Sequence, residues 1–263
     1  MNSQTLSVTH RNLNLSIAAK RRNNPQSDTT LVFLHGLGCA KECFDKAFEA
    51  DTLKEFSLLT FDFPGYEESS KPDGFSYSME DQAEVALSVI KQLETKKTVL
   101  VAHSMGGTIG LLAAQQLDNL VGFVNVEGNL VAEDAGIISR RTADQPESEF
   151  LAHGFDNFLA GLKNAGRSDF SAWAEWYEKS DRRAVYRSSQ SLVEWSDSGK
   201  LMSYFNELPH KAFIYGDEES KDYLLRQFRD VKTHCIPNSG HFMMLDDPEK
   251  FYEAIGEFIQ ADR

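Results

Sequence analysis

Residues 98–117 read Thr-Val-Leu-Val-Ala-His-Ser-Met-Gly-Gly-Thr-Ile-Gly-Leu-Leu-Ala-Ala-Gln-Gln-Leu. The first four residues form an apolar, β-branched run that is typical of a buried strand. Residues 108–117 are rich in Ala, Leu and Gln and predict a helix. A strand that turns directly into a helix, with Ser104 at the turn, predicts a nucleophile elbow, in which the sharp turn lifts a serine hydroxyl out of the sheet.

The residues around Ser104 suit such a turn. The turn is crowded, so the positions two before and two after the serine must be small, and they are Ala102 and Gly106. Ala102 departs from the usual Gly-x-Ser-x-Gly pattern by one methyl group. The free N–H groups at the start of the following helix would favour developing negative charge. Taken alone, the stretch also fits a glycine-rich turn whose serine has no catalytic role.

Four further motifs lie on either side of this stretch. They are His35-Gly36-Leu37-Gly38, Asp62-Phe63-Pro64-Gly65, Tyr215-Gly216-Asp217 and Gly240-His241-Phe242. Together with the serine motif they follow the order and spacing of the α/β-hydrolase superfamily, which the sequence resembles over nearly its whole length. The resemblance implies an α/β fold: a mostly parallel eight-stranded sheet flanked by helices, with a helical cap insertion.

Hydrophobic patterns predict the other strands and helices. Strands are expected at residues 6–10, 13–19, 30–34, 56–61, 120–126, 211–215 and 231–236. Helices are expected at residues 41–50, 78–94, 221–230 and 247–259. Residues 130–205 break the strand–helix alternation and hold all three tryptophans. The resemblance implies that they form the cap, with residues 1–129 and 206–263 as the core domain, and that some of their aromatic side chains face a pocket.

Composition excludes several classes of protein. A net charge of −13 argues against nucleic acid as a partner, because nucleic-acid binding needs a basic surface. No apolar run approaches the about 18 residues that span a membrane, and residues 1–10 lack the apolar core of a signal peptide. Cys39, Cys43 and Cys235 imply neither a disulfide framework nor a zinc site, and the first two are expected to be buried and inert. We therefore expect a cytoplasmic protein; nothing in the sequence sets its oligomeric state.

The resemblance also assigns roles to individual residues. A serine hydroxyl is a poor nucleophile at neutral pH, so Ser104 needs a base. His241, on the loop after the last strand, occupies the position of the base in the family. His103 is a poor candidate, because adjacent residues at a sharp elbow point apart. The backbone N–H groups of Leu37 and Met105 would form the oxyanion hole.

The acid that completes the triad has more than one candidate. Most family members carry it three residues past the glycine after the penultimate strand, which is Glu219 here, with Asp217 as the neighbouring choice. Other members carry a Glu at the end of the preceding strand, a position that Glu127 matches. A run of acids such as residues 217–219 is typical of a solvated loop, whereas a lone Glu at a buried strand end needs a reason to be there. We favour Glu127 and keep Glu219 as the alternative acid.

One loop departs from the family pattern Asp-x-Pro-Gly-x-Gly-x-Ser. Glu67 occupies the position of the second glycine. We therefore expect the loop to bend there without the left-handed conformation that glycine permits.

These features predict a serine hydrolase that cleaves an ester or thioester of a small to medium, partly apolar compound through an acyl-enzyme on Ser104. Serine at the elbow, where epoxide hydrolases and dehalogenases of the superfamily carry Asp, disfavours those two activities. Carbon–carbon bond hydrolysis of a diketone would use the same residues, and a ligand-binding receptor of the same fold is a second alternative. The expected partner is a small-molecule substrate, and the sequence implies no cofactor and no metal.

Overall fold

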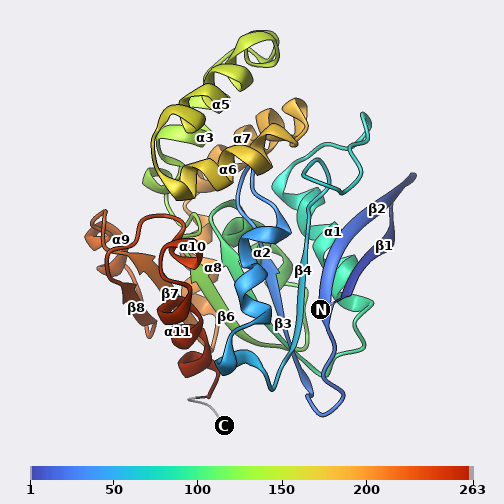
Figure 1. The fold of residues 1–263 in the computed structure, drawn as a ribbon, viewed down its shortest axis with the longest axis vertical. Helices are drawn as coiled ribbons and strands as arrows, with labels where there is room; N and C mark the ends of the chain where they lie inside the picture. Colours follow the sequence, from blue (N-terminus) through green and yellow to red (C-terminus); the bar gives the residue numbers. More distant parts are fainter. Residues whose placement is uncertain (1, 261–263) are drawn as a thin grey trace.

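The computed structural model describes residues 2–260 and contains an eight-stranded sheet (Figure 1). Its strands are β1 (Asn2–His10), β2 (Leu13–Arg22), β3 (Thr29–Leu34), β4 (Ser57–Phe61), β5 (Lys97–His103), β6 (Leu120–Val126), β7 (Lys211–Gly216) and β8 (Lys232–Ile236). They lie in the order β1-β2-β4-β3-β5-β6-β7-β8. β2 pairs antiparallel with β1 and with β4, and the other pairs are parallel. The prediction of a mostly parallel eight-stranded sheet is confirmed; residues 1 and 261–263 of the expected core domain lie outside the described residues.

The register of the central strands brings their carboxyl ends together. Leu34 of β3 pairs with Ala102 of β5, and His103 of β5 pairs with Val126 of β6. Val126 pairs in turn with Ile214 of β7. The loops that follow these four strands therefore open on one edge of the sheet, where ligands bind in open α/β folds.

Helices cover both faces of the sheet. One face carries α1 (Met79–Lys91), α2 (Met105–Ala114) and α8 (Lys200–Glu207); the other carries η1 (Lys41–Phe48), η2 (Asp51–Leu53), α10 (Met243–Asp246) and α11 (Pro248–Gln260). Ser78 caps α1, because its Oγ accepts the Asp81 N–H at 3.3 Å. Among residues 2–260, no helix combines the length and the apolar character needed to cross a bilayer.

Two of the expected helices are wrong in extent. Residues 41–48 form 3₁₀ turns that are interrupted at Phe44, whose φ of −107° and ψ of 16° are not helical. Within residues 221–230, α9 (Asp222–Leu225) is a single turn. Leu224 is the one fully buried side chain in that segment, so there is little apolar surface to stabilise a longer helix.

Between β6 and β7 the chain leaves the sheet and forms a helical insertion. Its elements are η3 (Ala132–Ala135), α3 (Gly136–Ala143), α4 (Glu147–Glu149), η4 (Phe150–Gly154), α5 (Phe155–Asn164), α6 (Ser168–Glu178) and α7 (Arg182–Asp197). Figure 1 shows α3, α5, α6 and α7 together beyond the carboxyl ends of the strands. Most of α8 lies within the range expected for the cap, but the helix packs on the flank of the sheet, where Phe205 contacts Phe123 of β6 with 6.1 Å between ring centroids.

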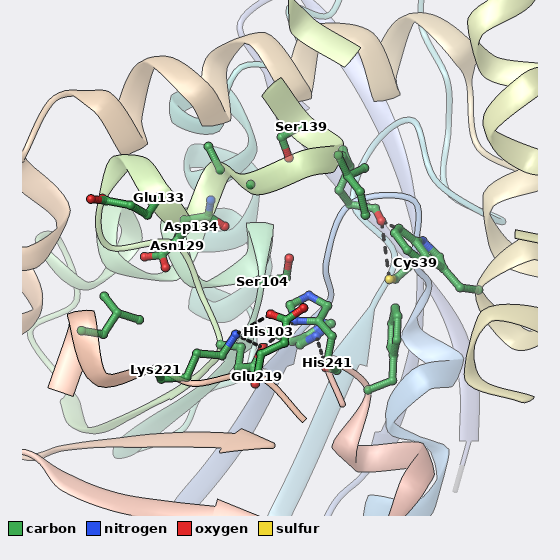
Figure 2. A pocket seen from close by; sticks show the side chains of 18 of the residues that line it. Cys39, His103, Ser104, Asn129, Glu133, Asp134, Ser139, Glu219, Lys221 and His241 are labelled. Carbon is green, nitrogen blue, oxygen red and sulfur yellow. Dashed lines mark hydrogen bonds and ion pairs between the residues drawn. The ribbon is translucent and has the colours of Figure 1, made fainter. Parts of the chain in front are cut away.

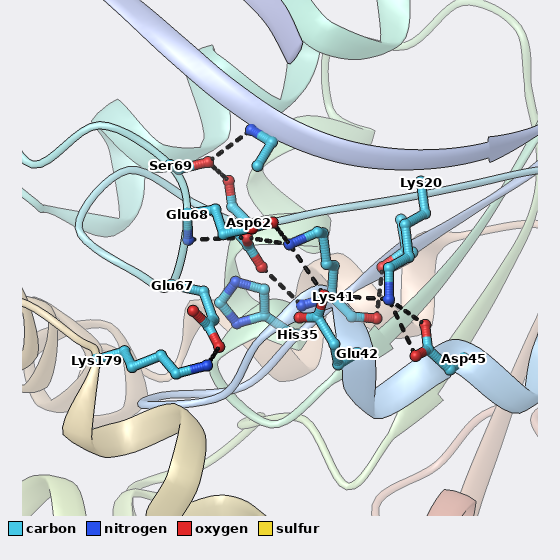
Figure 3. Close-up of polar contacts among 12 residues, drawn as sticks. Lys20, His35, Lys41, Glu42, Asp45, Asp62, Glu67, Glu68, Ser69 and Lys179 are labelled. Atoms are coloured by element: carbon cyan, nitrogen blue, oxygen red, sulfur yellow. Dashed lines mark hydrogen bonds and ion pairs between the residues drawn. The ribbon is translucent and has the colours of Figure 1, made fainter. Parts of the chain in front are cut away.

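A buried lysine joins the start of η1 to the loop after β4 (Figure 3). Lys41 Nζ lies 2.8 Å from Asp62 Oδ2 and 2.7 Å from Glu68 Oε2. The Lys41 N–H also donates to Asp62 Oδ1, at 2.8 Å. Burial alone would lower the pKa of Lys41, but the neighbouring carboxylates of Asp62, Glu68 and Glu42 outweigh it and raise that pKa. The paired charges hold the backbone of this loop in place, since a buried charge is tolerated only with such partners.

The expectation for Glu67 is wrong. Its φ is 40°, so it adopts the left-handed conformation although it is not glycine. Its side chain is nearly buried and its Oε1 binds Nζ of Lys179, at the carboxyl end of α6. This contact, which Figure 3 shows, ties the strained turn to the helical insertion and offsets the strain.

Candidate active site

Ser104 lies at a strained turn between β5 and α2. Its φ of 53° and ψ of −122° are rare for a residue with a side chain. The turn is fixed by two backbone hydrogen bonds, from Ser104 N–H to Val126 O at 3.0 Å and from Gly107 N–H to Ser104 O at 2.8 Å. A Cβ at Gly106 would lie 2.4 Å from the carbonyl oxygen of Leu34. The structure thus has the elbow geometry that the sequence predicted, with its demand for a small residue after the serine.

His241 and Glu127 meet beside this turn. His241, between β8 and α10, has its Nδ1 2.9 Å from Glu127 Oε2. Because a carboxylate accepts, Nδ1 carries the proton and Nε2 keeps a free lone pair. Glu127 directly follows β6 with a φ of 44°, and its Oε1 accepts the Gly216 N–H at 3.0 Å. The orientation of the imidazole is therefore set by a carboxylate that the neighbouring strand β7 holds in place.

The other two candidate acids do not reach His241. Glu219 is 82% exposed, and its Oε2 lies 3.2 Å from Lys221 Nζ. Asp217 Oδ1 accepts the Ser239 N–H at 3.3 Å. Of the acids considered from sequence, Glu127 is the one that the structure brings to the histidine.

The carboxyl of Glu127 is held in its charged form. Its side chain is 6% exposed, and burial alone would raise its pKa. The hydrogen bond from His241, the positive charge of Lys221 and the Gly216 N–H outweigh burial and lower the pKa of Glu127 to about 2. The carboxylate is thus ionised throughout the neutral range.

His103 supports the loop that carries His241. Its Nε2–H donates to the carbonyl oxygen of His241 at 3.0 Å, and the two ring centroids lie 4.6 Å apart. Burial, with a smaller contribution from His241, lowers the pKa of His103 well below its usual value, so the ring is neutral. The His103 ring thus binds the loop that carries His241 and is not bound to Ser104. This agrees with the expectation that His103 is a poor base for Ser104.

The loop after β3 is anchored from two sides. His35 Nε2 accepts the Phe63 N–H at 3.0 Å, which joins this loop to the loop after β4. From the helical insertion, Trp173 Nε1–H donates to the carbonyl oxygen of Leu37 at 3.1 Å. Directly after Ser104, Met105 opens α2, and N–H groups in the first turn of a helix have no partner within it. Leu37 lines the same cavity as Ser104, and Met105 directly follows the serine; their role as an oxyanion hole stays a prediction.

Ser104 and His241 line a common cavity of about 410 Å³. Figure 2 shows Asn129, Glu133, Asp134 and Lys221 on one side of Ser104 and Cys39 on the other. The apolar lining includes Leu37, Cys39, Ile138, Phe170, Trp173, Phe213, Leu224 and Phe242. Within the described part of the chain no hydrogen bond joins Ser104 Oγ to His241 Nε2; such bonds are often long without substrate.

The sequence comparison decides the family. Residues 31–254 match the profile of the Alpha/beta hydrolase family. The chain belongs to this family. Over 240 residues the hydrolase is 24% identical to "Putative esterase/lipase 2" of Mycoplasma pneumoniae, covering 87% of this chain and 88% of that protein.

Solved structures share the fold of the hydrolase. A thermophilic esterase from Thermogutta terrifontis superposes with a TM-score of 0.76 at 18% identity, covering 99% of both chains. The N-acyl homoserine lactonase AidH, in complex with N-butanoyl homoserine, gives a TM-score of 0.78 at 19% identity, covering 99% of this chain and 97% of that chain. At these identities the likeness shows a common fold, and the family membership identifies the chain as a hydrolase.

The two cysteines near the start of η1 are inert in the hydrolase, as expected from sequence. Cys39 and Cys43 are buried, and burial raises the pKa of both thiols above the usual value. Both therefore stay protonated at neutral pH and are poor nucleophiles. Cys39 contributes an apolar surface to the cavity.

Two contacts at the site of the hydrolase were not predicted from the sequence. Lys221 Nζ lies 3.1 Å from Glu127 Oε2, and Trp173 binds the loop of Leu37. A signal for Lys221 existed, since it follows β7 and the carboxyl ends of neighbouring parallel strands meet at one edge. For Trp173, the family resemblance implied only that some aromatic residues of the insertion would face the pocket.

Proposed function

We propose that this hydrolase cleaves a neutral carboxylic ester or thioester through an acyl-enzyme on Ser104. The observation that carries the proposal is the 2.9 Å hydrogen bond between His241 Nδ1 and Glu127 Oε2. It fixes the tautomer in which Nε2 is a base, in the cavity that Ser104 also lines.

The proposed reaction has two halves. Ser104 Oγ attacks the carbonyl carbon while His241 Nε2 takes the hydroxyl proton; the leaving alcohol or thiol then receives that proton as its bond to the carbonyl breaks. In the second half, water attacks the acyl-serine, His241 takes a proton from the water, and Ser104 is released with its proton restored. Glu127 keeps its negative charge throughout and stabilises the imidazolium that forms twice in the cycle.

Backbone N–H groups would stabilise the oxyanion. The proposed donors are those of Leu37 and Met105, which flank Ser104. Main-chain donors suit this task, because they are oriented before the charge develops. The anchoring of Leu37 by Trp173 supports this assignment, since it fixes the peptide plane next to the proposed donor.

The cavity wall favours uncharged substrates. Lys221 is the one lysine or arginine among the lining residues that the structure describes, and it is paired with Glu127. Glu133, Asp134 and Glu219 add further negative charge to the wall. We therefore propose a neutral substrate whose apolar part lies against Trp173, and we expect coenzyme A thioesters and other anionic esters to react slowly.

A fluorophosphonate probe tests the proposal, since it reacts with serines that an adjacent base activates. The probe should label the wild type on the peptide that contains Ser104, and the Ser104→Ala variant should stay unlabelled. The wild type should also turn over p-nitrophenyl butyrate. A folded wild type that binds ligands without labelling or turnover would favour a receptor and end the proposal. Labelling with turnover of a diketone but not of esters would favour carbon–carbon bond hydrolysis.

Replacing Trp173 with Phe tests the anchoring of the loop after β3. The variant keeps an aromatic ring in the buried position but loses the Nε1–H that binds the carbonyl oxygen of Leu37. We expect kcat for p-nitrophenyl butyrate to fall by about tenfold, with less change in KM, because the lost contact orients a group that acts in the transition state.

The control for this variant is Trp195→Phe. Trp195 Nε1–H donates to Glu80 Oε1 at 2.8 Å, and Trp195 does not line the cavity. Its replacement should leave kcat within about twofold. Equal losses of kcat in the two variants would show that Trp173 contributes only general stability.

A further inference from the structure

Glu127 Oε2 has a second partner besides His241. Lys221 Nζ lies 3.1 Å from this oxygen, and His241 Nδ1 lies 2.9 Å from it. We propose that Lys221 is a positioning residue of the catalytic triad: its ammonium group fixes the Glu127 carboxylate and sets the pH at which His241 ceases to act as a base. The inference rests on the proposed function, because it assumes that His241 is that base.

The contacts of Glu127 restrict the rotation of its carboxylate. Oε1 accepts the Gly216 N–H at 3.0 Å, and Oε2 accepts from His241 and from Lys221. The terminal torsion of a Glu side chain is otherwise broad. With a backbone donor on one oxygen and an ammonium on the other, the remaining lone pair of Oε2 is aimed at the imidazole.

Because Lys221 is largely buried, its charge acts on Glu127 with little screening by solvent. Its side chain is 10% exposed and that of Glu127 is 6% exposed, so solvent and salt screen the pair weakly. Burial alone would lower the pKa of Lys221, but the charges of Glu127 and Glu219 outweigh it and raise that pKa. Lys221 therefore stays positively charged throughout the neutral range.

A fixed positive charge behind the acid opposes protonation of the imidazole. A carboxylate in contact with an imidazole favours the imidazolium form of the ring. Lys221 offsets part of that negative charge. The pair of Lys221 and Glu127 thus orients the imidazole, and removing the charge of Lys221 should favour the imidazolium.

Other charged groups near His241 are already paired or neutral. On β5, His103 is neutral because it is buried. On the side of the helical insertion, Arg167 binds both Asp169, at 3.0 Å, and Glu218, at 2.9 Å. From α10, Asp246 Oδ2 accepts the N–H of Gly240 at 3.0 Å.

Across the cavity, Tyr223 Oη donates to Asp134 Oδ1 at 2.6 Å, and Glu219 contacts Lys221 itself at 3.2 Å. Lys221 is thus the cation in direct contact with Glu127 among the residues that the structure describes.

The test is the pH dependence of kcat/KM for p-nitrophenyl butyrate between pH 5 and pH 9. In Lys221→Met, which keeps the length of the side chain without its charge, the acid limb should move to higher pH by about one unit. Lys221→Arg keeps the charge and should leave the limb within about 0.3 unit of the wild type. Lys250→Met is the matched control, because Lys250 pairs with Asp247 on the surface at 2.6 Å; it should not move the limb.

Thermal melting separates this role from a purely structural one. A lower melting temperature in Lys221→Met with an unmoved acid limb would overturn the inference. So would an acid limb that moves as far in Lys221→Arg as in Lys221→Met. If Lys221→Met does not fold, Lys221→Gln, which is neutral but can still donate to Glu127, gives the same test. A folded wild type that the fluorophosphonate does not label overturns the proposed function and this inference together. A labelled wild type with an unmoved limb in the variant overturns this inference alone.

Discussion

Glu127→Gln should lower kcat on p-nitrophenyl butyrate by about 10⁴-fold while the protein keeps its fold. The amide has nearly the size of the carboxylate and can still accept the Gly216 N–H. It carries no charge to stabilise the imidazolium, and its NH₂ group, if turned towards His241, would favour the wrong tautomer. The loss should appear in kcat and equally in kcat/KM, because the interaction strengthens in the transition state.

Glu219→Gln is the matched control for this variant. Glu219 carries the same charge and lines the same cavity but is exposed and does not contact His241. Its kcat should stay within about threefold of the wild type. If Glu219→Gln were the variant with the large loss, the acid would have been assigned wrongly, and the contact seen between His241 and Glu127 would be structural only.

Gly106→Ala should destabilise the protein by about 4 kcal/mol or prevent it from folding. The added Cβ would lie 2.4 Å from the carbonyl oxygen of Leu34 and 2.7 Å from that of His35. Both atoms belong to the backbone at the end of a buried central strand, so neither can move without displacing β3. Urea unfolding followed by circular dichroism would measure the loss.

Gly161→Ala is the control, and its effect on stability should have the opposite sign to that of Gly106→Ala. Gly161 is exposed inside α5, and a Cβ there would meet no atom within 4 Å. Because alanine loses less conformational freedom in a helix than glycine, this change should stabilise the protein by about 0.5–1 kcal/mol. A Gly106→Ala variant as stable as the wild type would show that the elbow has more room than the structure gives it.

The elbow could be predicted from sequence because its determinants are local. A strand pattern, a small residue on either side of Ser104 and a helix pattern follow one another within residues 98–117. The strand positions could be predicted for the same reason, since each buried strand is a short apolar run between turns. That the strands form a mostly parallel sheet is implied by the resemblance to the α/β-hydrolase superfamily. Local patterns of this kind specify the backbone without reference to the rest of the chain.

The choice of acid depends on contacts that no local pattern contains. Glu127 and Glu219 follow neighbouring strands at the same edge of the sheet. Which of them reaches His241 is set by the left-handed turn at Glu127 and by the Gly216 N–H that binds its Oε1. Both features appear only when β6 and β7 lie side by side.

Contacts distant in sequence also explain two of the three local errors. The expected helix over residues 41–50 is interrupted at Phe44, and Lys41 at its start is bound to Asp62 and Glu68 from the next loop. Glu67 takes up a conformation suited to glycine because Lys179 of the insertion binds its side chain. In both places tertiary contacts outweigh the intrinsic preference of the residue.

The strand order has a consequence for biosynthesis. The proposed nucleophile directly follows β5 in the middle of the sheet, whereas His241 follows β8, which comes last in sequence among these eight strands and lies at the edge of the sheet. A growing chain exposes Ser104 long before the ribosome has made its base, and chains fold from the amino end as they emerge. On the proposed mechanism, incomplete chains therefore carry an unactivated serine, and catalytic competence arises only when β8 docks onto β7.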